Sequence, residues 1–218
     1  MPFLFPPDRD RVAVKICGLT RADEAAATIS AGADAIGINF WPSSKRFVAL
    51  EKALPWLREF AGSVPRVAVT VNASDEELRR IFDSGAIDWI QLHGDEGPER
   101  VASLAREGLP VFKAMGIRDA AMLELAAAFA SPTLLLDAYA PGAYGGSGET
   151  MDWALGAEAV SRFPERQIVL AGGLTPENVG EAVRQVRPAA VDVASGVESS
   201  PGRKDPAKVR AFLAAAKG

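Results

Sequence analysis

Cysteine and histidine are the scarcest reactive residues in this 218-residue chain, which has one of each. A single cysteine cannot form an internal disulfide, so nothing in the sequence points to an oxidising compartment. A single histidine gives poor support for a metal site made of histidine and cysteine ligands. We therefore expect neither a disulfide framework nor a bound metal.

Basic residues are not in excess, and long apolar runs are missing. Lys and Arg number 24 against 28 Asp and Glu, for a net charge of −4, which provides no broad positive field for nucleic acid or for an anionic membrane. The N-terminal stretch MPFLFPPDRDR is too short and too rich in proline to be the apolar part of a secretory signal. No apolar run is long enough to cross a bilayer. These absences predict a cytoplasmic protein with no nucleic-acid or membrane partner.

What the chain does contain is a regular alternation of two patterns. Short runs rich in β-branched residues are followed by longer segments with apolar residues at helical spacing. The candidate strands are 12–16, 34–38, 66–71, 88–92, 110–114, 133–137, 167–171 and 190–194. Eight strand–helix units at this chain length predict a closed barrel of parallel strands. We predict an α/β fold, a single-domain (β/α)8 TIM barrel over residues 12–218, with residues 1–11 as an N-terminal arm.

This fold locates the functional site before any motif is considered. In such barrels the active site is built from the C-terminal ends of the strands and from the loops that follow them. The loops after the second, sixth and eighth predicted strands are longer than a simple connection requires. Reactive side chains at these strand ends are therefore the candidates.

Cys17 lies at the end of the first predicted strand. An isolated cysteine is most often a small buried core residue. Lys15 precedes it by two residues, so both side chains point to the same face, which should be the barrel interior because lysine is too polar for the helix-packed face. A cation beside a thiol can lower its pKa. Asp192, inward by the same alternation, could pair with Lys15 and weaken that effect, and the sequence leaves the balance open.

Asp137 closes the run TLLLD. An aspartate at a strand end is commonly a turn residue or a helix cap, but no helix begins soon after this one. A carboxylate at the catalytic face of a barrel favours a functional role. His93, after the fourth strand, is expected to be a polar wall residue, and Asp152 to cap the helix after the sixth loop.

Arg46 lies in the long second loop, within WPSSKRF. A solvated surface arginine is the common alternative. Because Trp41 and Phe47 flank it, an aromatic ligand with an anionic group is plausible, and a guanidinium can hold a carboxylate through two hydrogen bonds.

Two glycine-bearing loops, AGGLTPEN and ASGVESSPG, follow the seventh and eighth strands. Tight turns would explain the glycines, but barrels with phosphorylated substrates frequently hold the phosphate at these two loops. Glycine lets backbone N–H groups approach a ligand, and Thr175-Pro176 has the pattern of a helix cap and first turn. The candidate phosphate-binding residues are Gly172, Gly173, Ser195 and Gly196.

Several of these motifs together resemble one known family. VKICGLT, GADAIGINF with WPSSKR, VAVTVN, QLHGDE, LLLDAYAPGAYGGSGETMDW, LAGGLTPENV and VDVASGVESSPGRKD are similar in order and spacing to the phosphoribosylanthranilate isomerases of tryptophan biosynthesis. The resemblance runs from about residue 12 to the C-terminus and covers all eight units. The N-terminal arm lies outside it, and we assign the arm no role.

The resemblance implies an Amadori rearrangement of N-(5-phosphoribosyl)anthranilate, a small phosphorylated substrate, without a cofactor. It implies Cys17 as general base, Asp137 as general acid and Arg46 as the residue that holds the anthranilate carboxylate. Where the family often has lysine in the sixth loop, this chain has Glu149. A carboxylate repels a phosphate, so no phosphate contact is assigned to this side chain. Whether the protein is a monomer or a homodimer stays open.

Two other enzymes and one non-enzyme are alternatives. A ribulose-phosphate epimerase needs several metal-binding histidines, and an indole-glycerol-phosphate synthase needs more inward lysines and glutamates at its strand ends than this chain offers. A phosphate-binding barrel without catalysis would be expected to have replaced Cys17 or Asp137, and both are present.

Overall fold

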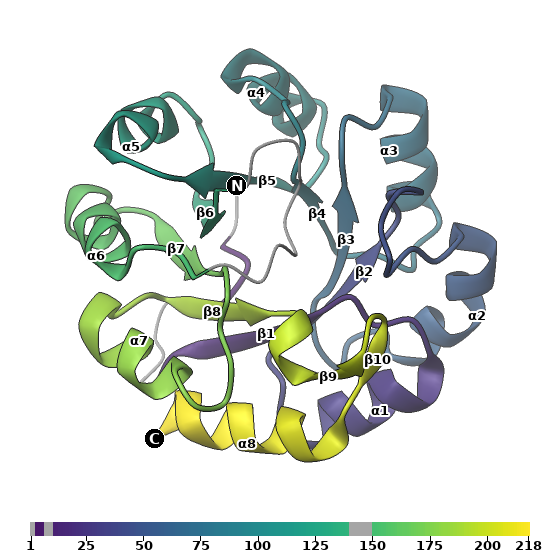
Figure 1. The fold of residues 1–218 in the computed structure, drawn as a ribbon. Helices are drawn as coiled ribbons and strands as arrows, with labels where there is room; N and C mark the ends of the chain where they lie inside the picture. Colours follow the sequence, from purple (N-terminus) through teal and green to yellow (C-terminus); the bar gives the residue numbers. More distant parts are fainter. Residues whose placement is uncertain (1–2, 7–10, 140–149) are drawn as a thin grey trace.

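Eight runs of buried, mostly β-branched or leucine-rich residues form parallel strands that pair in chain order and close on themselves (Figure 1). The computed structural model describes residues 3–6, 11–139 and 150–218. Its barrel strands are β1 (Ala13–Cys17), β2 (Ala35–Asn39), β3 (Arg66–Thr70), β4 (Trp89–Leu92), β5 (Val111–Ile117), β6 (Thr133–Ala138), β7 (Gln167–Leu170) and β8 (Ala190–Val193). The predicted (β/α)8 barrel is confirmed.

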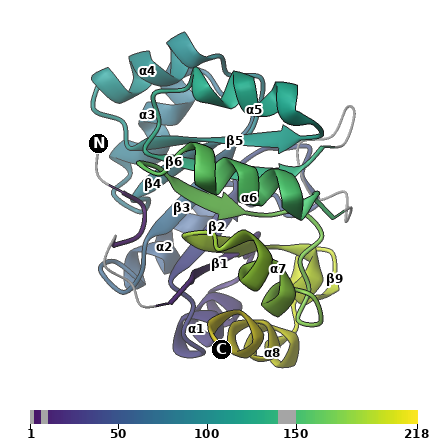
Figure 2. The ribbon, with the colours of Figure 1, turned by 90° about the vertical axis from the view of Figure 1, so that its left-hand side faces the viewer.

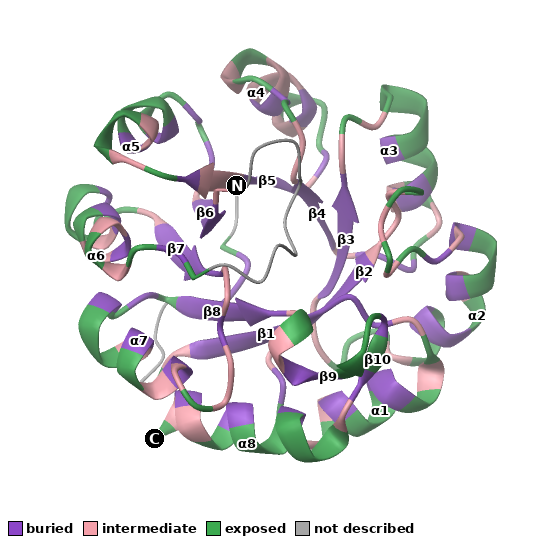
Figure 3. Ribbon diagram, viewed as in Figure 1, coloured by how far each residue is buried: buried purple, intermediate pink, exposed green. Residues whose placement is uncertain are grey.

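Helices surround this barrel, each between two strands or after the last one (Figures 1 and 2). They are α1 (Ala22–Ser30), α2 (Leu50–Glu59), α3 (Asp75–Asp83), α4 (Pro98–Arg106), α5 (Ala120–Ala127), α6 (Trp153–Arg162), α7 (Val179–Val186) and α8 (Pro206–Lys217). Figure 3 shows buried positions on their inner sides and exposed positions outside. Asp152 caps α6 as predicted, because its carboxylate accepts from the Ala154 N–H at 2.9 Å.

The predicted strands agree with the observed ones to within a residue at each end, except at β5. β5 continues to Ile117, three residues beyond its predicted end, because its last residues pair with Leu136, Asp137 and Ala138 of β6. The eighth loop contains a short antiparallel hairpin, β9 (Glu198–Ser200) and β10 (Arg203–Lys204), which the sequence did not predict. In the described part of the chain, no helix is both long and apolar enough to cross a membrane.

The alternation along β1 sorts its side chains between two separate cores. Val14 and Ile16 belong to the larger apolar cluster, between strands and helices. Ala13 belongs to the smaller cluster inside the barrel. Lys15 and Cys17 share the parity of Ala13, so they face the interior, as predicted. β1 therefore delivers a lysine and a cysteine to the inside of the barrel.

The N-terminal arm closes the opposite end of this interior. Leu4 and Phe5 are 3% and 2% exposed and join the inner apolar cluster. The Phe5 N–H donates to Gln167 Oε1 at 3.1 Å, and Gln167 Nε2 donates to the Phe5 carbonyl at 2.6 Å. Figure 2 shows the arm and the β9 hairpin at opposite ends of the barrel.

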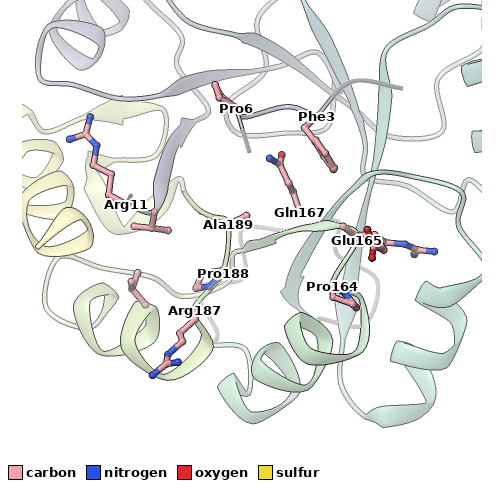
Figure 4. Close-up of a pocket in the computed structure, with 12 residues that line it drawn as sticks. Phe3, Pro6, Arg11, Pro164, Glu165, Gln167, Arg187, Pro188 and Ala189 are labelled. Carbon is pink, nitrogen blue, oxygen red and sulfur yellow. The ribbon is translucent and has the colours of Figure 1, made fainter. Parts of the chain in front are cut away.

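A cavity of about 490 Å³ lies beside the arm, at the N-terminal ends of β7 and β8 (Figure 4). Figure 4 shows Gln167 between Phe3 of the arm and Ala189, the residue before β8. The arm therefore packs against the bottom of the barrel, at the end remote from the strand C-termini.

Candidate active site

Cys17 is held at the C-terminal mouth of the barrel by its neighbour on β2. The register pairs Cys17 with Gly37. A Cβ atom at Gly37 would lie 2.7 Å from Cys17 Sγ and 3.1 Å from Lys15 Nζ. A side chain at position 37 would push against both reactive groups, so glycine leaves them room.

Lys15 forms an ion pair below the thiol, with its Nζ 2.8 Å from Asp192 Oδ1, and both residues are buried. Burial raises the pKa of the Cys17 thiol; Lys15 and Lys204 oppose this, Asp192 adds to it, and the pKa stays above its ordinary value. The pairing that the sequence left open is therefore formed, and the resting site holds Cys17 as a thiol.

Asp137 lies on β6 and is also buried. Its Oδ1 accepts from the Ala138 N–H at 2.8 Å, and its Oδ2 lies 3.4 Å from His93 Nε2. Gln91 Nε2 lies 3.0 Å from His93 Nδ1. Since the Gln91 amide donates, the second imidazole nitrogen carries the hydrogen that faces Asp137. The sequence missed Gln91, although its position two residues before His93 places both on the same face of β4.

Arg46 reaches the mouth from the loop between β2 and α2 by crossing the backbone at Gly18. A Cβ atom there would lie 2.3 Å from Arg46 Cδ, and Gly18 has a φ of +76°. The guanidinium donates from Nε and Nη2 to the two carboxylate oxygens of Glu198, at 2.7 and 2.8 Å. Lys204 Nζ donates to the same carboxylate at 2.9 Å. The sequence missed Glu198 and Lys204, whose only signal is their place in the long eighth loop.

A cavity of about 600 Å³ lies among these groups. Cys17, Arg46 and Asp137 all line it, as do Trp41 and His93. Its volume is that of a small-molecule site, and its walls combine an aromatic ring with a few polar groups. The three reactive residues that the sequence singled out thus meet in one pocket at the C-terminal ends of the strands.

The two glycine-bearing loops touch each other beside this pocket. A Cβ atom at Gly196 would lie 1.9 Å from the Leu174 carbonyl oxygen, so only glycine fits between the loops. Gly172 and Gly173 have φ values of +84° and +61°, the left-handed conformation that favours glycine. A Cβ atom at Gly172 would also lie 3.0 Å from Asp137 Oδ1. Among the described residues that line the cavity, Ser195 is present and the three glycines are not.

Comparison with known proteins decides the family. Residues 14–215 match the family model of N-(5'-phosphoribosyl)anthranilate (PRA) isomerase. The chain belongs to the PRA isomerase family. It is 45% identical to the PRA isomerase of Citrifermentans bemidjiense over 204 residues, which cover 94% of this chain and 96% of the relative.

Solved structures of PRA isomerases have the same fold. The Thermotoga maritima enzyme superimposes with a TM-score of 0.85 at 39% identity, covering 94% of this chain and 98% of the other. Another PRA isomerase structure, solved in complex with reduced 1-(o-carboxyphenylamino)-1-deoxyribulose 5-phosphate, has a TM-score of 0.82 at 38% identity, with the same coverage. Membership of the PRA isomerase family makes the protein an isomerase.

One predicted helix start differs in the structure, and one residue of the sixth loop falls outside the part of the chain that the structure describes. Thr175-Pro176 does not begin a helix: α7 starts at Val179 with Asn178 at its N-cap. The preceding residues form a turn because Asn178 Oδ1 accepts from the Thr175 N–H at 2.8 Å. Glu149 of the sixth loop lies outside the described residues. Within the described ranges, no cluster of three or more His, Cys, Asp or Glu side chains is placed to hold a metal ion.

Proposed function

We propose that the protein converts N-(5-phosphoribosyl)anthranilate into 1-(2-carboxyphenylamino)-1-deoxyribulose 5-phosphate, a step of tryptophan biosynthesis. Cys17 is the general base and Asp137 the general acid. The observation that carries the proposal is the single cavity that Cys17, Asp137 and Arg46 line together, in a chain of the PRA isomerase family.

Ring opening is the step assigned to Asp137. A proton passes from the Asp137 carboxylic acid to the ribose ring oxygen while the bond from that oxygen to C1 breaks. The lone pair of the anthranilate nitrogen then forms a C1=N bond, which gives a protonated Schiff base. His93 Nε2, 3.4 Å from Asp137 Oδ2, faces the carboxylate that remains. A nearby hydrogen-bond donor stabilises that charge.

Proton abstraction at C2 is the step assigned to Cys17. The thiolate removes the C2 proton, the electron pair forms a C1=C2 bond, and the Schiff-base electrons return to nitrogen. The resulting enolamine becomes the ketone when its hydroxyl loses a proton and C1 gains one. Before this step the Cys17 thiol loses its proton to solvent: burial raises the pKa of the free thiol, whereas the positive Schiff base favours the thiolate once the ring has opened.

The remaining candidates bind the two ends of the substrate. Arg46 holds the anthranilate carboxylate. Gly172, Gly173, Ser195 and Gly196 hold the phosphate through the backbone of the two adjacent loops. The left-handed glycines and the close contact between the loops support this assignment, since exposed N–H groups at such loops bind phosphate.

The test is direct conversion of freshly generated substrate, followed by the appearance of the C2 ketone signal in carbon NMR. Because substrate and product are isomers, this signal separates rearrangement from hydrolysis. Wild-type kcat/KM is expected to rise with pH from the neutral into the alkaline range, since burial raises the pKa of Cys17. Hydrolysis to anthranilate with no ketone formed would refute the proposal.

A further inference from the structure

Among the residues that the structure describes, the Arg46 guanidinium is hydrogen-bonded along one edge. Nε and Nη2 each donate to one oxygen of Glu198, at 2.7 and 2.8 Å. This is the paired, planar arrangement in which arginine and carboxylate bind most specifically. A guanidinium has five N–H donors, and the pair uses two of them. The end edge, formed by Nη1 and the second hydrogen of Nη2, is not used by Glu198.

Glu198 is itself firmly held, so it can orient Arg46. Its side chain is 5% exposed, and Lys204 Nζ binds Oε1 at 2.9 Å. Lys204 also donates to the Ala194 carbonyl, and Lys208 donates to the Glu198 carbonyl, both at 2.9 Å. Glu198 is thereby tied through Lys204 to the residue after β8 and through its backbone to α8, outside the loop that carries Arg46.

The charges of this group leave an unbalanced cation. Arg46 and Lys204 are two positive groups that share one carboxylate. Burial raises the pKa of Glu198, but hydrogen bonds and charge from Arg46 and Lys204 outweigh it and keep the pKa below its ordinary value. Glu198 is therefore ionised at neutral pH. Burial lowers the pKa of Lys204 although Glu198 opposes this, and with Lys204 protonated the three side chains carry one net positive charge next to the cavity that Arg46 and Glu198 line.

We propose that Glu198 is a positioning residue: it holds the Nε–Nη2 edge of Arg46, so that the end edge faces the cavity and receives the carboxylate of an aromatic ligand. The inference rests on the proposed function, because it takes anthranilate as the aromatic end of the substrate. Glu198 acts only through Arg46 and touches no reacting atom. A second carboxylate bound at the end edge balances the remaining positive charge.

The chain contains a matched control for a buried carboxylate of this kind. Glu96 is paired with Lys113 at 2.8 Å, and its side chain is 2% exposed. Its remaining hydrogen bonds come from the backbone N–H groups of Asn72 and Gly94, both at 2.8 Å. Glu96 thus has the burial and the lysine partner of Glu198, but no arginine directed into the cavity.

The experiment is calorimetric titration of anthranilate into the wild type, Glu198→Gln, Arg46→Ala, their double variant and Glu96→Gln. Glu198→Gln places an amide NH₂ or a single oxygen against the two donors of Arg46, so anthranilate affinity should fall about tenfold or more. The anthranilate affinity of Arg46→Ala should fall at least as far, and that of the double variant should fall no further than in Arg46→Ala. Glu96→Gln should bind anthranilate as the wild type does.

Glu198→Asp covers the case in which Glu198→Gln does not fold. It keeps the negative charge that Lys204 and Arg46 require, but it is one methylene shorter and cannot keep both bonds to Arg46. Its affinity for anthranilate should therefore fall several-fold with little change in the melting temperature. A merely electrostatic role for Glu198 would leave the affinity of this variant at the wild-type value.

Three results would overturn the inference: wild-type affinity in Glu198→Gln or Glu198→Asp, additive losses in the double variant, or no anthranilate binding by the wild type. Turnover of the full substrate by the wild type shows whether the positioning role of Glu198 has failed or the proposed function itself. If the wild type forms the ketone but the Glu198 variants bind anthranilate normally, only the positioning role is lost.

Discussion

The two ends of the barrel interior are closed by opposite kinds of residue. At the N-terminal end, Leu4 and Phe5 of the arm join an apolar cluster. At the C-terminal end, the buried carboxylates of Asp192 and Glu198 line the cavity, and the buried Lys15 pairs with Asp192. Apolar burial stabilises a fold in proportion to the area removed from water, whereas buried charges cost desolvation energy that their pairing only partly offsets. The apolar N-terminal end thus stabilises the barrel, whereas the charged C-terminal end carries the candidate active site.

Replacing Cys17 should give the largest effect, a loss of turnover with little loss of stability, and this would show that the C-terminal end serves catalysis. Cys17→Ala removes the proposed general base, so kcat should fall about 10²–10⁴-fold. Removing a small side chain next to a cavity should change the melting temperature little. Steady-state kinetics and thermal unfolding check both parts. Near-wild-type turnover would return Cys17 to a packing role.

The Lys113–Glu96 pair is an exception to the contrast between the two ends. It lies at the C-terminal end of the barrel but does not line the cavity, so it should affect stability and not ligand binding. Lys113→Met leaves the Glu96 carboxylate buried without its cation, which should lower the free energy of unfolding by about 3–5 kcal/mol. Urea denaturation measures the loss. In variant enzyme that remains folded, anthranilate affinity should match the wild type. A stability loss under about 1 kcal/mol would show that the backbone donors satisfy Glu96 on their own.

The arm should affect stability and leave catalysis unchanged. Phe5→Ala removes a side chain that is 2% exposed, so the free energy of unfolding should fall by about 3 kcal/mol. Phe3→Ala is the matched control, since Phe3 is 39% exposed, and it should cost well under that amount. Denaturation and turnover are measured on both. A fall in kcat with Phe5→Ala at unchanged stability would contradict the division of labour between the two ends.

The smallest effect concerns acid stability. Despite burial, hydrogen bonds and charge from Arg46 and Lys204 lower the pKa of Glu198 from its reference value of 4.5. A carboxyl group with a lowered folded-state pKa contributes stability above its unfolded pKa, and this is lost as pH falls through the folded value. The difference in unfolding free energy between wild type and Glu198→Gln should therefore shrink below pH 4.5. A difference that stays constant with pH would show that Glu198 has the same pKa in both states.

Strand parity and strand ends predicted which side chains reach the mouth of the barrel, because they fix where side chains point. Lys15, Cys17 and Asp137 followed from this rule alone. The bond between Arg46 and Glu198 could not be predicted in this way, since it joins two loops 152 residues apart and depends on the β9 hairpin. The role of the arm was equally hidden, because a short apolar run among prolines has no periodicity to interpret.

The hydrogen bonds between Phe5 and Gln167 also constrain the order in which the chain can fold. They join residues 162 positions apart, and the pairing of β1 with β8 spans a similar distance. During synthesis, which proceeds from the N-terminus, Leu4 and Phe5 emerge before β7 and have no docking site until β7 has been made. Contacts of such high sequence separation form slowly. Leu4 and Phe5 therefore stay undocked until β7 has been made, and we expect their docking to come late in folding, together with the pairing of β1 and β8.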